Sequence, residues 1–177
     1  MTPGSAFEAA KIAALLFVAA IVQVAILDEV RILGGTPDLL LVMLVAIALL
    51  RGTLVGALGG FFAGLLVDTA TLDVLGLTSL LLTISGYWIG RYGETTGRDR
   101  SHAPFVSVAV VTFLYAFGAL LVHFMLGTHA PAGAVLRDVW PSIALNLLLT
   151  APVYAVTRRL LRPADWNERA TEVQLLG

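Results

Sequence analysis

The stretch that decides the fold runs from residue 36 to residue 68 and reads TPDLLLVMLVAIALLRGTLVGALGGFFAGLLVD. An uninterrupted apolar run, 39–50, ends at Arg51 and Gly52, and a second apolar run follows at once. Twelve helical residues extend about 18 Å, which is short of a hydrocarbon core of ~30 Å. The first helix is therefore expected either to reach the membrane surface through a snorkelling Arg51 or to lie as a partial span inside the protein.

The composition of the whole chain predicts a polytopic membrane protein. Of its 177 residues 58% are hydrophobic and 13% are charged, and the mean hydropathy is +0.90. These values exclude a soluble globular domain and a disordered chain. We expect an all-α fold, with residues 1–162 as one membrane domain and 163–177 as a polar cytoplasmic tail. Six transmembrane helices are predicted at about 12–27, 37–51, 53–67, 77–90, 105–127 and 141–157.

The distribution of basic residues predicts the orientation of these helices. With six spans and both termini in the cytoplasm, nine of the eleven basic residues fall on the inner side. They are Lys11, Arg51, Arg91, Arg98, Arg100, Arg158, Arg159, Arg162 and Arg169. Only Arg31 and Arg137 fall outside, as the positive-inside rule requires. The charge distribution accordingly predicts that both termini lie in the cytoplasm.

Helix-end signals refine the predicted boundaries. Thr36 is a plausible N-cap, Pro37 a first-turn proline and Asp38 a first-turn acid that favours the positive helix end. Trp140 and Pro141 are expected to open the sixth span.

Small residues four apart mark the third span. Gly56, Gly60 and Gly64 lie on one slowly drifting face, and Asp68 continues the same spacing in the loop expected beyond the helix. Small residues at this spacing let helix backbones approach closely in lipid. The stripe is therefore expected to serve either internal packing or a partner's helix. Asp68 opposes the dipole of its own helix, so it is either an exposed acid or a hydrogen-bonded one.

Polar side chains inside the predicted spans gather towards one side of the membrane. Six of them fall in the outer halves of their helices in this topology. They are Gln23, Asp68, Ser79, Thr83, His123 and Asn146. Polar residues in a membrane are costly, so these predict either a polar region near the outer face or separate hydrogen bonds between helices. For Asn146 we expect a packed hydrogen bond to the Leu148 carbonyl that Pro152 leaves free.

Nothing in the sequence predicts catalysis or a bound cofactor. The chain has no cysteine, and its three histidines form no metal-binding or nucleophile motif. A net charge of −1 gives no footprint for nucleic acid. We therefore expect no enzyme activity, no metal and no cofactor.

The ordered set of motifs resembles the MreD family of rod-shape-determining bacterial membrane proteins. A Pro-Asp pair opens a short Leu-rich helix, a Gly-rich helix with a Gly-Phe pair ends in Asp, and Leu-Gly precedes the next helix. The matching positions are Pro37, Asp38, Gly56, Gly60, Phe61, Gly64, Asp68, Leu75 and Gly76, with Asn146, Pro152, Arg158 and Arg159 farther on. The tail after Pro163 departs from the family by being longer and more acidic.

The resemblance implies a non-enzymatic subunit of the cell-elongation machinery. Such proteins bind MreC, a single-span protein with an extracytoplasmic domain, and act alongside MreB filaments and the peptidoglycan synthase pair. Their fold is thought to be similar to the substrate-binding component of energy-coupling-factor vitamin transporters. The alternative is therefore a vitamin-binding membrane component of an importer.

Overall fold

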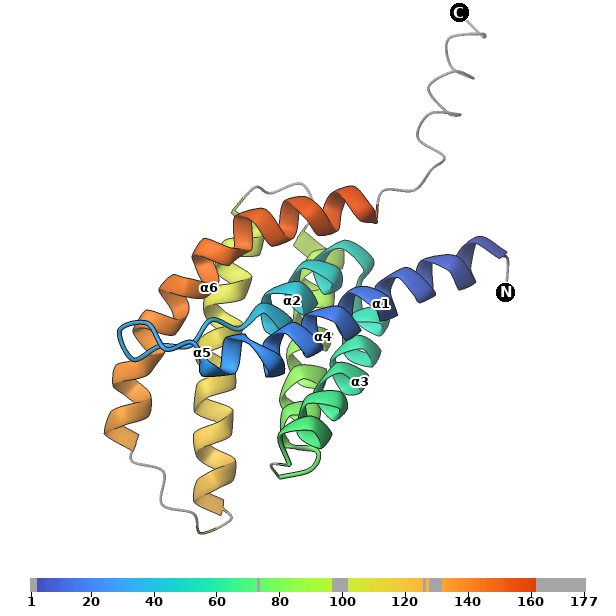
Figure 1. Cartoon of the computed structure of the whole chain (residues 1–177). Helices are drawn as coiled ribbons and strands as arrows, with labels where there is room; N and C mark the ends of the chain where they lie inside the picture. Colours follow the sequence, from blue (N-terminus) through green and yellow to red (C-terminus); the bar gives the residue numbers. More distant parts are fainter. Residues whose placement is uncertain (1–2, 73, 97–101, 126, 128–131, 162–177) are drawn as a thin grey trace, which may run out of the picture.

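The computed structural model describes residues 3–72, 74–96, 102–125, 127 and 132–161, and these residues form six α-helices (Figure 1). The helices are α1 (Pro3–Ala25), α2 (Leu39–Arg51), α3 (Thr53–Thr71), α4 (Leu77–Thr96), α5 (Ala103–Met125) and α6 (Ala132–Leu160). A short 3-10 turn, η1 (Leu27–Glu29), follows α1, and the described part contains no strand beyond one isolated bridge between Ile32 and Gly35. The predicted all-α fold is confirmed.

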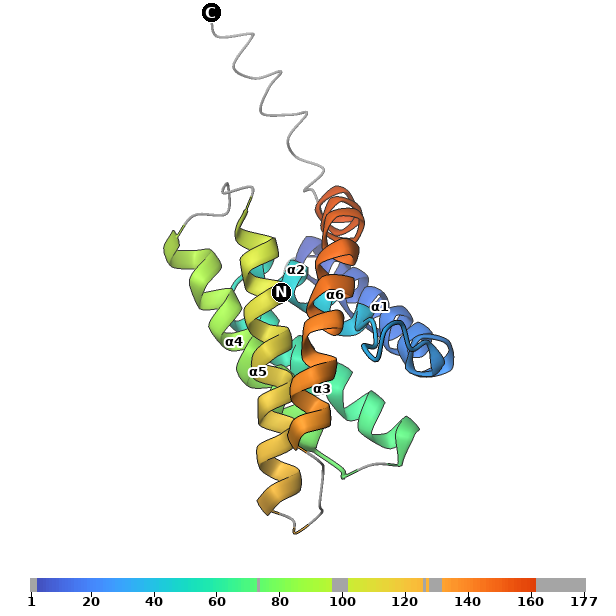
Figure 2. The same ribbon diagram turned by 90° about the vertical axis from the view of Figure 1, so that its left-hand side faces the viewer.

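The short helix α2 lies at the centre of the molecule. Every residue from Leu40 to Leu49 is buried, and α2 contacts each of the other five α-helices (Figures 1 and 2). A helix of 13 residues is only about 20 Å long. Because its whole circumference is covered by protein, α2 is a partial span packed inside the bundle, the second of the two arrangements that its length allowed.

Arg51 at the end of α2 joins three helices. Its guanidinium donates two hydrogen bonds to the Glu8 carboxylate on α1, at 3.0 and 3.1 Å, and a third to the carbonyl of Leu161 beyond α6. A bidentate pair with a carboxylate holds the side chain in a fixed direction. Gly52, with φ of 92°, then turns the chain directly into α3.

Four helices are long and apolar enough to cross a membrane. They correspond to Ala6–Glu29, Thr53–Thr71, Ala103–Val122 and Val135–Leu160. Helix α2 is apolar but shorter, and α4 has the length but a more polar sequence. The six expected helices are thus present. Of these, α1, α3, α5 and α6 have the length and apolarity of a membrane span.

Several helices extend beyond the predicted spans, and some predicted helix ends are wrong. Helix α1 begins at Pro3 rather than residue 12, and α3 and α4 run past residues 67 and 90 to Thr71 and Thr96. The sequence analysis assigned these added ends to loops, and of the added end of α3 Asp68 is buried whereas Thr69 and Thr71 are exposed. Asp68 therefore lies in the last turns of α3, not in a loop. The N-cap of α2 is Asp38 rather than Thr36, and Pro37 precedes the helix.

The largest error concerns α6, which begins at Ala132 instead of at Pro141. Both Pro141 and Pro152 lie inside the helix. An internal proline removes one backbone donor and clashes with the preceding turn. Membrane helices tolerate an internal proline where neighbouring groups compensate for the lost bond. Pro141 cannot donate to the carbonyl of Arg137, and beside it Ser142 Oγ donates to the carbonyl of Asp138 at 2.9 Å. Figure 1 shows that α6 bends along its length. The predicted tail, 163–177, falls outside the described residues.

Candidate functional site

Helices α3 and α4 meet along a seam of small residues. A Cβ atom added at Gly56 would overlap the carbonyl oxygen of Gly86, and one added at Gly60 would overlap that of Leu82. A Cβ atom at Gly64 would overlap the Cα of Ser79. The stripe therefore packs backbone to backbone against α4 and does not present a free face.

The α4 side of this seam has its own glycines, which the sequence analysis missed. A Cβ atom at Gly86 would overlap the carbonyl oxygen of Gly56, and one at Gly90 would meet the backbone of Gly52 and Thr53. Gly86 and Gly90 are four residues apart, so the same small-residue spacing that marks α3 was present in α4.

Asp68 links the two helices of the seam by capping α4. Its carboxylate accepts hydrogen bonds from the backbone N–H groups of Gly76 at 2.8 Å, Thr78 at 3.1 Å and Ser79 at 3.2 Å. The side chain is only 1% exposed. The unfavourable dipole of α3 is thus offset by the favourable N-terminus of α4.

A second polar cluster surrounds the N-terminus of α2. The Asp38 carboxylate accepts from the N–H of Leu41 at 2.8 Å. Gln23 on α1 accepts from the N–H of Leu39 at 2.8 Å and donates to the carbonyl of Pro37 at 3.2 Å. It also donates to Asp28 at 2.8 Å. Since α2 begins inside the protein, these side chains replace the water that a surface helix would use.

Asn146 extends this cluster to α5 and α6. Its side-chain oxygen accepts from the N–H of Asp38 at 2.7 Å, and its amide nitrogen donates to Thr112 Oγ1 at 3.0 Å. The expected bond to the Leu148 carbonyl is wrong, because the amide group is committed to these two partners. The cluster therefore ties α1, α2, α5 and α6 together.

The polar candidates thus fall into two separate clusters. Within the described residues no buried side-chain nitrogen or oxygen lacks a hydrogen-bond partner. Ser79 Oγ donates to the Phe61 carbonyl at 2.9 Å, and Thr83 Oγ1 donates to the Ser79 carbonyl at 2.6 Å. His123 lies in α5, and its side chain is outside the described part. Both clusters are used for internal bonds between and within helices.

Other positions of the family motif have distinct settings. The N–H of Gly76 donates to Asp68, and its φ of 93° is one that residues with a side chain rarely adopt. Phe61 is exposed on α3, whereas its carbonyl takes part in the seam. Pro152 is exposed within α6.

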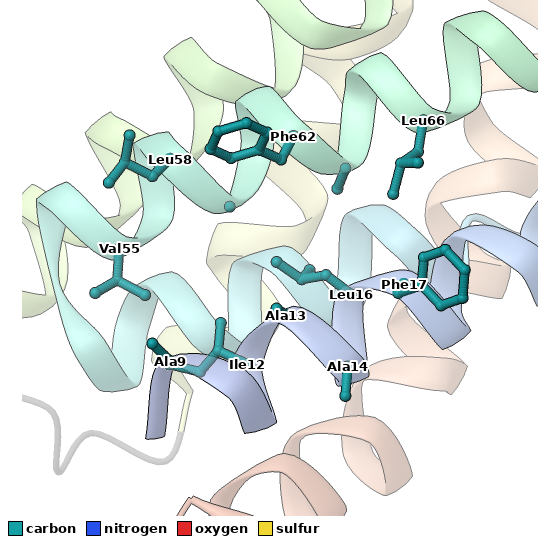
Figure 3. Close-up of a pocket in the computed structure, with 12 residues that line it drawn as sticks. Ala9, Ile12, Ala13, Ala14, Leu16, Phe17, Val55, Leu58, Phe62 and Leu66 are labelled. Carbon is teal, nitrogen blue, oxygen red and sulfur yellow. The ribbon is translucent and has the colours of Figure 1, made fainter. Parts of the chain in front are cut away.

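An open groove runs between α1 and α3, which touch at its floor, on the face of α3 that turns away from α4. It has a volume of about 610 Å³, and its lining is apolar (Figure 3). Small residues Ala13, Gly59 and Ala63 line it together with the larger Phe17 and Phe62. A smaller hollow of about 380 Å³ continues between the same two helices. Among the described residues, no group of three or more His, Cys, Asp and Glu side chains could hold a metal ion.

Comparison with known proteins identifies the family. The family model described as rod shape-determining protein MreD matches residues 8–163. The chain belongs to the MreD family. Its helices and this membership make it a multi-pass membrane protein with a role in determining rod shape. No curated protein and no solved structure matches the chain in these comparisons.

Proposed function

We propose that this MreD-family chain is a non-enzymatic membrane subunit of the cell-elongation machinery. It binds MreC and so supports peptidoglycan synthesis, alongside MreB and the peptidoglycan synthase pair. The observation that carries the proposal is the family match over residues 8–163. The packing supports a scaffold, because the buried polar side chains of the described part are all bonded internally.

The proposed docking face for MreC is the groove between α1 and α3. A single-span partner must approach from the lipid, and this groove is apolar and lined by two of the four spanning helices. Association in lipid depends on close packing of surfaces. The exposed small residues Ala9, Ala13 and Ala14 of α1 give a partner helix room to approach, while Phe17 and Phe62 offer large contact surfaces. The glycine stripe of α3 is already covered by α4, so it is not free to receive a partner helix, whereas the groove is open.

We further propose that the chain lies in the inner membrane with both termini in the cytoplasm, as the nine-to-two division of basic residues favours. Two exposed positions test this orientation in the cysteine-free chain. A cysteine at Leu75, between α3 and α4, should react with an impermeant thiol reagent added to spheroplasts. A cysteine at Thr95, near the end of α4, should react only after the membrane is permeabilised. The reverse pattern would contradict the proposed orientation.

Copurification tests the docking proposal. Ala9→Trp and Ala13→Trp place bulky side chains into the groove from exposed positions on α1, so folding should be preserved while MreC is displaced. Ala144→Trp on α6 is the control, because Ala144 is exposed outside the groove. We expect the two groove variants to lose most of the MreC recovered by tagged wild-type protein, and the control to retain it. Equal recovery by all three variants would refute this docking face.

The importer alternative makes a different prediction for the same purified protein. A vitamin-binding component needs polar groups directed at its ligand, whereas Gln23, Asp38, Asp68 and Asn146 all bond to other parts of the chain. This arrangement favours the scaffold. A small molecule released on denaturation of the purified chain would instead support the importer component.

A further inference from the structure

A second kind of hollow lies where α5 begins and α6 ends. Its volume is about 600 Å³, and it is called here the interfacial groove. Ala151, Tyr154 and Ala155 of α6 and Phe105 of α5 form its apolar part, and Arg158 and Arg159 line its end. The groove therefore changes along α6 from an apolar surface to a cationic one within about 12 Å.

The position of the two arginines places this cationic end at the edge of the membrane. The apolar stretch of α6 extends over Val135–Leu160, so Arg158 and Arg159 occupy its last turn. Long basic side chains at such a helix end extend towards the headgroup region. Ala155 and Ala151 lie about one and two turns deeper, respectively, where acyl chains run.

The charges of the groove are available to an anion. Arg158 and Arg159 are both exposed, and neither takes part in an ion pair or side-chain hydrogen bond with another described residue. The ion pair seen in the described part joins Arg51 to Glu8 instead. Helix α5 begins at Ala103, so the positive end of its dipole adds to the same potential beside Phe105.

We propose that the interfacial groove binds an anionic phospholipid, with its phosphate at Arg158 and Arg159 and an acyl chain along Phe105, Ala151 and Ala155. Basic pockets between membrane helices on the cytoplasmic side bind such headgroups. A free anion would use the arginines but leave the apolar wall uncovered. A soluble acidic peptide would not enter the part of the groove that lies at acyl-chain depth. This inference does not depend on the MreC proposal.

Native mass spectrometry of the purified full chain tests the proposal. The protein is offered equal amounts of phosphatidylglycerol and phosphatidylethanolamine with identical acyl chains. We expect the wild-type protein to retain phosphatidylglycerol preferentially. In the double variant Arg158→Gln, Arg159→Gln, the ratio of bound phosphatidylglycerol to bound phosphatidylethanolamine should fall roughly tenfold. The control double variant Lys11→Gln, Arg91→Gln removes two charges outside the groove and should keep it. An unchanged preference in the arginine variant, or an equal loss in the control, would overturn the proposal.

A second variant separates a lipid from other anions. Ala155→Phe fills the apolar part while leaving both arginines in place, so it should weaken phosphatidylglycerol binding several-fold. It also keeps the test decisive if the arginine variant fails to fold. Unchanged lipid binding by Ala155→Phe would contradict the proposed position of the acyl chain. Displacement of the lipid from the wild-type protein by inorganic phosphate or a polyglutamate peptide, at concentrations equal to the lipid, would identify a free-anion or peptide site instead.

Discussion

The two sides of α3 differ in how they use small residues. On one side Gly56, Gly60 and Gly64 bring the backbone of α3 against that of α4 with no space between them. On the other side a groove of about 610 Å³ opens between α3 and α1, and Phe62 stays 61% exposed. One helix thus makes a closed seam and an open groove.

This difference teaches which contacts stabilise a bundle in lipid. Burying apolar surface gains little there, because lipid chains are as apolar as the side chains they would leave. The seam is held by close packing and by the three hydrogen bonds that Asp68 accepts. An apolar groove lowers the stability of the bundle very little, because lipid chains can fill it. Substitutions in the seam should therefore affect folding, and those in the groove should affect association.

The largest effect is expected for Gly60→Leu. The new side chain would meet the backbone of Leu82, which cannot move without separating α3 from α4. Overpacking costs about 1–3 kcal/mol where side chains can adjust, and we expect the upper end of this range or more. Ala9→Leu adds a large side chain to the groove and serves as the control. The measurement is the folded fraction by size-exclusion chromatography in detergent, and equal yields for both variants would remove the distinction between the two faces.

The next effect concerns Asp68. Asp68→Leu leaves three backbone N–H groups of α4 without their acceptor, and each unsatisfied donor costs roughly 1–3 kcal/mol. Asp68→Asn retains one carbonyl oxygen and should fold better than the leucine variant. Thermal unfolding in detergent should therefore rank wild type first, then Asn, then Leu. A leucine variant as stable as the wild type would show that the cap contributes nothing.

A smaller loss is expected for Asn146→Leu. This change leaves one backbone donor, the N–H of Asp38, and the Thr112 hydroxyl without their partner. The expected cost is about 1–3 kcal/mol, below that of Asp68→Leu because fewer backbone groups are affected. Leu148→Ala on the exposed face of α6 is the control. If the control loses as much stability in the same unfolding experiment, the polar cluster at α2 does not stabilise the fold.

The smallest effect on stability is expected for Phe62→Ala. Phe62 is exposed in the groove, so its removal should change stability by less than about 0.5 kcal/mol. The same variant should recover less MreC in copurification. A large drop in unfolding temperature would show that the groove side of α3 is part of the packed core.

Much of this fold follows from the order of residues along the chain. Apolar runs identified six helices because the bilayer requires continuous hydrophobic stretches, and spacing identified the stripe of α3. The same information cannot fix helix ends, because a helix can continue beyond its apolar run, as α6 does from Ala132. Pro141 was misplaced because a proline that opens a helix and one tolerated inside it look alike in the sequence, and only the structure shows that α6 begins at Ala132.

The partners of the polar residues needed the structure. Gln23 and Asn146 are 123 positions apart in the sequence, and both accept hydrogen bonds from backbone N–H groups at the start of α2. No local pattern pairs them. Asp68 was recognised as unusual because of its own helix dipole, but the helix that it caps begins only at Leu77. The groove between α1 and α3 left no sequence signal, because it depends on how two helices diverge.

Cysteine crosslinking to MreC tests the central claim most directly, because the chain has no cysteine of its own. Single cysteines at Leu58, in the groove, and at Leu80, exposed on α4, are each combined with cysteines scanned through the MreC span. After mild oxidation, Leu58→Cys should form disulfides with MreC positions three or four residues apart, the period of one helix face. Leu80→Cys should form none. Crosslinks from Leu80→Cys with none from Leu58→Cys would contradict the assignment of the open face of α3 to the partner.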